Sequence, residues 1–297
     1  MEQASMTARL CLFLRAYHTV SFPVRVLDDP PARQLLTDVE FQQTTAALTQ
    51  GISFLAPNVQ GTEQEALRWA VNRRLSPAPL GRAVFAEQSL ERAVAAGAGQ
   101  ALLLGAGYDT FAYRQPAWAK CLRMFEVDHP ATMADKQRRA REAGLPAPDN
   151  TWYVPADLTQ PHWWEGLLRC PGFSPQDVSV CSLLGLVYYL PAPALDTLLT
   201  DLEALLPAGS TLVLDYTVPQ PQTSMQAQMA SAAGEPMQTG WSSEALTALL
   251  ERHDFSVREL LEPQDITERF FADFDRAEPR FPLIAPEDLR FCRAVRR

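Results

Sequence analysis

The feature that most constrains the fold is a regular alternation of short apolar runs with longer amphipathic segments in the middle of the chain. The runs cover residues 101–104, 123–127, 152–155, 178–184 and 211–215. Such alternation is typical of βαβ units, in which a helix returns the chain to begin the next parallel strand. We therefore expect an α/β fold with a mostly parallel sheet and helices on both of its faces.

Helix and edge-strand signals complete this pattern. Residues 129–143 are predicted to be helical because a proline opens the segment and a glycine follows it. Leucines recur at helical spacing over residues 195–206, which predicts a second helix. Two late apolar runs, 255–260 and 291–295, predict an antiparallel pair of strands at the edge of the sheet.

The flanking segments predict a cover over the sheet. Residues 1–80 carry helical signals that several prolines interrupt, so we expect a helical N-terminal cap that covers the substrate. Residues 81–297 are expected to form the α/β domain. Within it, residues 219–240 are rich in Pro, Gln, Ser and Met without periodicity, and we interpret them as a lid that closes over the ligand. A helix is predicted to begin near Ser242.

Composition excludes several classes of partner. The formal net charge of −9 and the sequence pI near 5.0 provide no basic face for nucleic acid. The 5 cysteines are far apart and form no CxxC pair, so neither a disulfide framework nor a metal site is expected. We find neither a leader pattern nor a run of about 18 apolar residues. We expect no membrane partner and a cytoplasmic location, and the oligomeric state stays open.

The first candidate site is a glycine turn after the first strand of the pattern, where Gly105 and Gly107 follow an apolar run. Glycine permits a positive φ and lets a ligand approach the backbone closely. In a doubly wound sheet such a turn lies at the carboxyl edge, where nucleotides bind. A plain tight turn is the alternative.

The second candidate is an acidic residue at the end of the next strand. Glu126 and Asp128 alternate there, roughly twenty residues after the glycines, at the spacing of an acid that binds ribose hydroxyls. Asp128 lies nearer the loop, so we expect it to reach the ribose. The alternative is that Asp128 only caps the following helix.

The third candidate favours S-adenosylmethionine over a dinucleotide. Asp157 and Leu158 end the third strand, where a carboxylate can accept from the adenine amino group and a backbone N–H can donate to a ring nitrogen. Thr110 stands where the GxGxxG pattern of dinucleotide-binding proteins has its third glycine. A nicotinamide-dependent oxidoreductase and a non-catalytic binding protein with the same fold remain the alternatives.

Short motifs spread from residue 82 to residue 191 occur in the order of one known family. They are Arg82 and Glu87 before Ala98-Gly99-Gln100, Gly105-Ala106-Gly107-Tyr108-Asp109-Thr110 with Arg114, Glu126-Val127-Asp128-His129-Pro130, Asp157-Leu158 and Tyr189-Leu190-Pro191. In these residues the chain resembles the leucine carboxyl methyltransferase family, including bacterial relatives that methylate small metabolites such as polyketide carboxylates. Asp28-Asp29-Pro30 resembles the family more loosely.

This resemblance implies a class I methyltransferase with a Rossmann-like, seven-stranded sheet and S-adenosylmethionine as the cofactor. It also implies methylation of an oxygen, often a carboxylate, in a small molecule of secondary metabolism. The cofactor contacts that it implies are Arg82, Gly105, Gly107, Asp128, Asp157 and Leu158. Arg82 would meet the cofactor's carboxylate with its planar donor fork. A solvated ion pair between Arg82 and Glu87 is the alternative.

Two departures from the family pattern bear on the substrate. Phe111 stands where many relatives have arginine, and Leu184 stands where the protein-phosphatase branch has a glutamate after the fourth strand. The second departure argues against a protein-phosphatase C-terminus as the methyl acceptor.

The nature of the acceptor determines whether a base is needed. A carboxylate is ionised at neutral pH and needs none, whereas a hydroxyl would need one, such as a histidine. His129 and His18 are the candidates for that role, although each is more often structural; His162 and His253 are expected to be surface residues of helices.

Two tyrosines end the fourth strand of the pattern. Because neighbours on a strand point to opposite sides, we expect only one of Tyr188 and Tyr189 to touch the substrate. Arg82 and Tyr189 are therefore the candidate catalytic residues.

Overall fold

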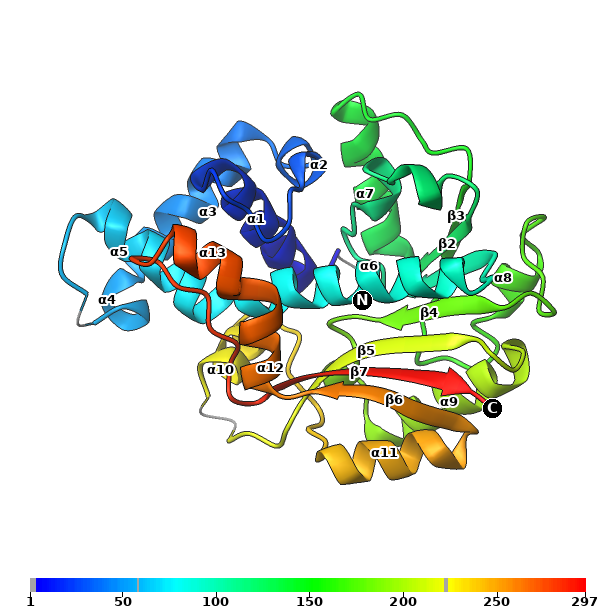
Figure 1. The fold of residues 1–297 in the computed structure, drawn as a ribbon. Helices are drawn as coiled ribbons and strands as arrows, with labels where there is room; N and C mark the ends of the chain where they lie inside the picture. Colours follow the sequence, from blue (N-terminus) through cyan, green and yellow to red (C-terminus); the bar gives the residue numbers. More distant parts are fainter. Residues whose placement is uncertain (1–3, 58, 222–223) are drawn as a thin grey trace.

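A single seven-stranded sheet organises the molecule (Figure 1), and its strand order is β3-β2-β1-β4-β5-β7-β6. The computed structural model describes residues 4–57, 59–221 and 224–297. The strands are β1 (Gln100–Leu104), β2 (Arg123–Asp128), β3 (Thr151–Pro155), β4 (Ser179–Leu183), β5 (Thr211–Thr217), β6 (Phe255–Leu261) and β7 (Leu289–Arg296). Strands β1 to β5 pair in parallel, which confirms the predicted α/β fold with a Rossmann-like sheet.

The two late strands form the predicted antiparallel pair. Strand β7 lies between β5 and β6 and is antiparallel to both of them, so β6 is the edge strand. The chain between them is not a tight turn, because it forms α12 (Pro263–Ile266), the π-helical η5 (Thr267–Phe271) and α13 (Ala272–Ala277).

Side chains that alternate along the strands pack into two separate apolar cores, one on each face of the sheet. Leu102 and Leu104 of β1 pack on the face covered by α9 (Ala192–Leu205) and α11 (Ser243–Arg252), whereas Ala101 packs on the face covered by α6 (Pro77–Ala95). This alternation follows from the two-residue period of a strand. The leucines predicted over 195–206 are buried against the first face, which confirms that helix.

The other predicted helix over 129–143 is α7 (Pro130–Glu142), and the helix predicted near Ser242 is α11, which that serine caps. The remaining elements between the strands are short, namely η2 (Phe111–Tyr113), η3 (Ala117–Ala119), α8 (Glu165–Leu168) and η4 (Val187–Tyr189).

Among the helices of the first 95 residues, α6 lies along one face of the sheet, and the others lie beside the sheet near the ends of its parallel strands (Figure 1). The helices of this part of the chain are α1 (Met6–Ser21), α2 (Pro30–Gln34), α3 (Asp38–Gln50), α4 (Ile52–Leu55), α5 (Glu63–Ala70), the π-helical η1 (Val71–Leu75) and α6. A third apolar cluster joins α1, α2 and η1 to Tyr108 of the glycine turn. The cover is therefore packed directly on the chain segment that follows β1.

The predicted lid contains a helix that its composition did not indicate. α10 (Met225–Ala232) begins after Ser224, whose hydroxyl accepts from the N–H of Ala227. Residues 222–223 of the predicted lid lie outside the described residues, so "lid segment" below means residues 224–240. In the described part of the chain, no helix is both long and apolar enough to cross a membrane.

Candidate active site

A cavity of about 460 Å³ lies at the carboxyl ends of the parallel strands. Every site residue predicted from the sequence lines it: Arg82, Gly105, Gly107, Asp128, Asp157, Leu158 and Tyr189. These residues come from the ends of β1, β2 and β3, from α6 and from η4. The topology of the sheet thus brings together motifs that are far apart along the chain.

The glycine turn has the conformation that its sequence predicts. The φ angles of Gly105 and Gly107 are +70° and +53°, which L side chains rarely adopt. A Cβ atom at Gly107 would lie 3.2 Å from the Cβ of Ala8 in α1. The turn therefore needs glycine both for its backbone angle and because α1 approaches it closely.

Asp128 faces the glycine turn and binds its backbone. Its Oδ2 accepts from the N–H of Gly107 at 2.6 Å, and its Oδ1 accepts from the N–H of His129 at 2.6 Å. Burial raises the pKa of this carboxyl, against the effect of the two hydrogen bonds. The cap of α7 is His129 rather than Asp128, because the Nδ1 of His129 accepts from the N–H of Ala131.

Glu126, the other acid of this strand, has a different environment. It pairs with Lys136 of α7, and both side chains are almost completely buried. Neither residue is among those that line the cavity. The preference for Asp128 over Glu126 therefore agrees with where the structure places the two carboxylates.

Asp157 and Leu158 line the cavity from the segment that follows β3. The carboxylate of Asp157 accepts from the N–H and the hydroxyl of Thr159, at 3.0 and 2.6 Å. Burial alone would raise the pKa of this carboxyl, but the bonds from Thr159 outweigh burial and lower it. Leu158 is buried beside it and supplies an apolar surface.

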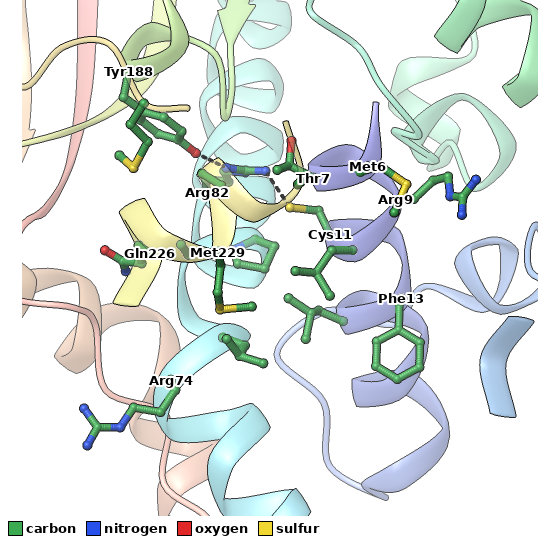
Figure 2. Close-up of a pocket in the computed structure, with 18 of the residues that line it drawn as sticks. Met6, Thr7, Arg9, Cys11, Phe13, Arg74, Arg82, Tyr188, Gln226 and Met229 are labelled. Carbon is green, nitrogen blue, oxygen red and sulfur yellow. Dashed lines mark hydrogen bonds between the residues drawn. The ribbon is translucent and has the colours of Figure 1, made fainter. Parts of the chain in front are cut away.

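Arg82 is held in place by partners that the sequence did not reveal. Its Nη1 donates to the Tyr188 hydroxyl at 3.0 Å, and its Nη2 donates to the Sγ of Cys11 at 3.3 Å (Figure 2). Nη1 also donates to Oδ2 of Asp215 at 3.3 Å. The alternative of an ion pair between Arg82 and Glu87 is wrong, because the carboxylate of Glu87 accepts hydrogen bonds from both terminal nitrogens of Arg114.

Asp215 anchors this arrangement from the buried end of β5. Its side chain is completely buried, and its Oδ1 accepts from the N–H of Gly185 at 2.5 Å. A Cβ atom at Gly185 would lie 2.5 Å from Nη1 of Arg82, and the φ of Gly185 is +63°. The guanidinium can therefore lie against the backbone only because residue 185 is glycine.

A second cavity of about 340 Å³ adjoins the first. The residues that line both cavities are Thr7, Cys11, Pro79, Arg82, Tyr188 and Tyr189, which we call the neck. Beyond the neck the walls are mostly apolar and include Leu10, Phe13, Leu14, Leu75, Met229 and Met237. Met225 of the predicted lid instead packs against the clusters around α1 and α4.

Both tyrosines line the neck, so the expectation that only one would face the site is wrong. The chain leaves β4 at Leu183 and forms the 3-10 turn η4, in which the strand rule no longer applies. The rings of Tyr188 and Tyr189 meet edge to face with centroids 4.8 Å apart. Burial raises the pKa of Tyr189 to about 12 and also raises the pKa of Tyr188 well above its ordinary value, so both hydroxyls stay protonated at neutral pH.

The histidines have structural environments. His18 lines neither cavity; its Nε2 accepts from the N–H of Val26, and burial lowers its pKa to about 4. His129 lines the larger cavity and caps α7. His162 is exposed as expected, but it lies in a turn before α8 and not in a helix. His253 was expected at the surface but is buried, and its Nε2 lies 3.0 Å from Oδ1 of Asp196.

The smaller cavity holds no free base among its described lining residues. They include no histidine, and their one carboxylate is that of Glu40. Arg139 donates to both oxygens of Glu40 at 2.7 and 2.8 Å and lowers the pKa of that carboxyl to about 2. This carboxylate is therefore paired and ionised at neutral pH.

Comparison with known proteins decides the family. The family model of leucine carboxyl methyltransferase matches residues 8–203, which is more than half of the chain. The chain belongs to this family. A relative from Bacillus subtilis (strain 168), YktD, is 34% identical over 284 residues that cover 92% of this chain and 93% of the relative, and its name places it among S-adenosyl-L-methionine-dependent methyltransferases.

Solved structures of low sequence identity share the fold. A DUF574 family protein from Streptomyces avermitilis superposes with a TM-score of 0.61 at 13% identity, over 99% of this chain and 98% of that one. A protein from Thermobifida fusca, whose name describes a methyltransferase, superposes with a TM-score of 0.57 at 18% identity, over 100% and 96%. The fold is that of the class I methyltransferases, as the sequence predicted.

This protein is thus an S-adenosylmethionine-dependent methyltransferase, and its larger cavity suits that cofactor. The glycine turn leaves room for a ligand at the end of β1, and Asp128 keeps unused lone pairs on both oxygens for the ribose hydroxyls. Asp157 and Leu158 line the same cavity and would offer a polar and an apolar surface to the adenine. Family membership decides between this cofactor and the nicotinamide alternative.

Proposed function

We propose that this enzyme transfers the methyl group to a carboxylate of a small, mostly apolar metabolite, with Arg82 and Tyr189 at the point of transfer. The observation that supports this acceptor is the neck, where Arg82 is the charged residue that lines both cavities. A hydroxyl acceptor would need a base, and the smaller cavity offers only the paired Glu40. A carboxylate arrives already ionised.

The residues of the neck then have defined tasks. S-adenosylmethionine supplies a methyl group already activated by its sulfonium, so positioning provides most of the catalysis. We assign the planar N–H donors of the Arg82 guanidinium to the carboxylate of the acceptor, in place of the cofactor carboxylate that the family resemblance implies. Tyr189 can donate a hydrogen bond from its protonated hydroxyl. The apolar walls around Met229 exclude water from the site.

We assign the substrate cover to two parts of the chain. The N-terminal cap is assigned to residues 1–80, of which 1–3 and 58 lie outside the described residues, and it contributes Thr7, Cys11 and Phe13 to the smaller cavity. The methyltransferase domain with its lid is assigned to residues 81–297. An acceptor that fits this cavity is a compact small molecule, such as an acid of polyketide-like secondary metabolism. The cavity lies in the lower range of volumes that small-molecule sites occupy.

A matched substrate panel tests this acceptor class. The full chain is incubated with S-adenosylmethionine and aromatic or aliphatic acids, each paired with the phenol or alcohol of the same carbon skeleton. We expect methyl esters from the acids and no ethers from their partners. With an acid that reacts, Arg82→Lys should lower kcat/KM by about two orders of magnitude, and His129→Gln by much less. Methylation of the hydroxyl partners alone, or a larger loss in the His129 variant, would contradict carboxyl methylation.

A further inference from the structure

Glu235 joins the lid segment to the beginning of α1. Its Oε2 accepts from the Ser5 hydroxyl at 2.9 Å and from the Thr7 hydroxyl, and its Oε1 accepts from the N–H of Met6 at 2.7 Å. The acceptor and the three donors are separated by about 230 positions in the chain, so this contact forms only when the chain is folded. Hydrogen bonds to a carboxylate are among the stronger ones in proteins.

The C-terminal part of the lid segment is attached to the rest of the chain in two ways. At its base, the N–H of Gln238 donates to the carbonyl of Tyr188 at 2.7 Å, and the N–H of Trp241 donates to the carbonyl of Thr217 at 2.8 Å. These backbone bonds do not depend on any side chain. Near the end of α10, in contrast, the hydrogen bonds to α1 converge on the side chain of Glu235, which one substitution can remove.

The lid segment lines both cavities. Gly234, Glu235, Pro236 and Gln238 line the larger one, and Gln226, Met229, Ala230, Ala233 and Met237 line the smaller one. Figure 2 shows α10 with Met229 and Gln226 opposite Thr7 and Cys11 of α1, with Arg82 beside them. Separation of α10 from α1 would therefore widen both cavities at once.

Glu235 also acts on the neck through Thr7. The Thr7 hydroxyl donates its one proton to Glu235 and contacts the hydroxyl of Tyr189, so any hydrogen bond between the two hydroxyls has Tyr189 as its donor. Gly234 precedes Glu235 with a φ of +76°, and this turn at the end of α10 brings the carboxylate back toward α1. The same contact therefore joins the lid segment to a residue that lines the neck.

We propose that Glu235 is a latch and a positioning residue: its carboxylate holds the lid segment on α1, fixes Thr7 beside Tyr189, and must release for ligands to enter and leave. This role depends on the cofactor cavity and not on which acceptor the enzyme takes. Rates of cofactor exchange therefore test it separately from the carboxylate acceptor proposed above.

The experiment follows S-adenosylhomocysteine binding to the full chain by stopped-flow tryptophan fluorescence, since Trp241 lies at the base of the lid segment. In Glu235→Ala we expect the association and dissociation rate constants to rise together, each by about tenfold or more, because opening no longer breaks charge-assisted bonds. Glu235→Gln should give a smaller rise, since its amide oxygen still accepts. Glu244→Gln, an exposed glutamate in the first turn of α11, should behave as the unmodified protein does.

Thr7→Val removes one hydroxyl from the latch and supplies an independent check. It should raise both rate constants less than Glu235→Ala, and the double variant should not exceed Glu235→Ala alone, because both changes remove the same contact. A loss of packing alone would give independent effects that multiply. Unchanged rate constants in a natively folded Glu235→Ala variant, or multiplying effects in the double variant, would overturn the latch. If Glu235→Ala does not fold, Thr7→Val decides by the same measurement.

Discussion

Replacing Asp128 by asparagine removes the charge at the ribose position while leaving the shape of the side chain almost unchanged. The aspartate has about four lone-pair positions, and two of them accept from the N–H groups of Gly107 and His129. The other two remain for the two ribose hydroxyls. Asparagine keeps one acceptor oxygen and brings an NH₂ group that must face donors. At least one charge-assisted bond to the ribose is therefore lost, and one backbone donor loses its acceptor.

Hydrogen bonds to charged groups contribute about 1.5–3 kcal/mol each. We therefore expect Asp128→Asn to weaken S-adenosylhomocysteine binding by about 2–3 kcal/mol, which corresponds to roughly 30- to 150-fold in Kd. Isothermal titration calorimetry measures this change directly. Asp28→Asn is the matched control, because the side chain of Asp28 is 59% exposed and pairs only with Arg25 among the described residues. An affinity within threefold of the unmodified protein, in a variant with native circular dichroism, would refute the ribose contact.

Two further predictions concern the N-terminal cap. Asp29 is completely buried and accepts from Arg15 at 2.9 Å and from Thr110 at 2.7 Å. Asp29→Asn should therefore lower the free energy of unfolding by about 3–5 kcal/mol in urea titrations, whereas Asp28→Asn should lower it by less than about 0.5 kcal/mol. Equal losses in the two variants would contradict this prediction. Burial lowers the pKa of His18 from its ordinary value of 6.5 to about 4 in the folded protein, so the imidazole binds a proton more tightly in the unfolded chain. The neutral His18 therefore contributes fully to the free energy of unfolding above pH 6.5, and that free energy should fall by up to about 3 kcal/mol as the pH drops toward 4. His18→Gln should flatten this pH dependence.

Local motifs explain why residues that line the larger cavity could be predicted. The glycine turn and Asp128 depend on a strand end, a backbone angle and a short spacing, and all of these are visible within about 25 consecutive residues. Their chemistry is fixed by the cofactor, so the same residue types are needed wherever this fold binds it. Asp157 follows from the same logic at the next strand. All of them line the larger cavity.

Contacts over long sequence separations could not be predicted in the same way. Arg82 and Asp215 are 133 positions apart, and Ser5 and Glu235 are 230 apart. No periodicity or spacing marks such pairs, because they are created by the order of strands in the sheet and by the packing of α1 on α10. An acid at the end of the fifth strand was the only local signal for Asp215. The alternative partner considered for Arg82, Glu87, came from looking only at a neighbour in sequence.

The environment of Arg82 also bears on how an anionic acceptor could be oriented and still react. A guanidinium with no counter-charge in a closed site would hold a carboxylate tightly and lower its nucleophilicity. Here Asp215 lies 3.3 Å from Nη1 and is fully buried, so it offsets part of that charge. Removing Asp215 would leave a buried cation without its partner, which is strongly unfavourable. Gly185 allows both groups to lie against the strand end at once. Under the carboxylate proposal, the pair thus supplies directed N–H donors with a moderated charge, which is what displacement at a sulfonium methyl group requires.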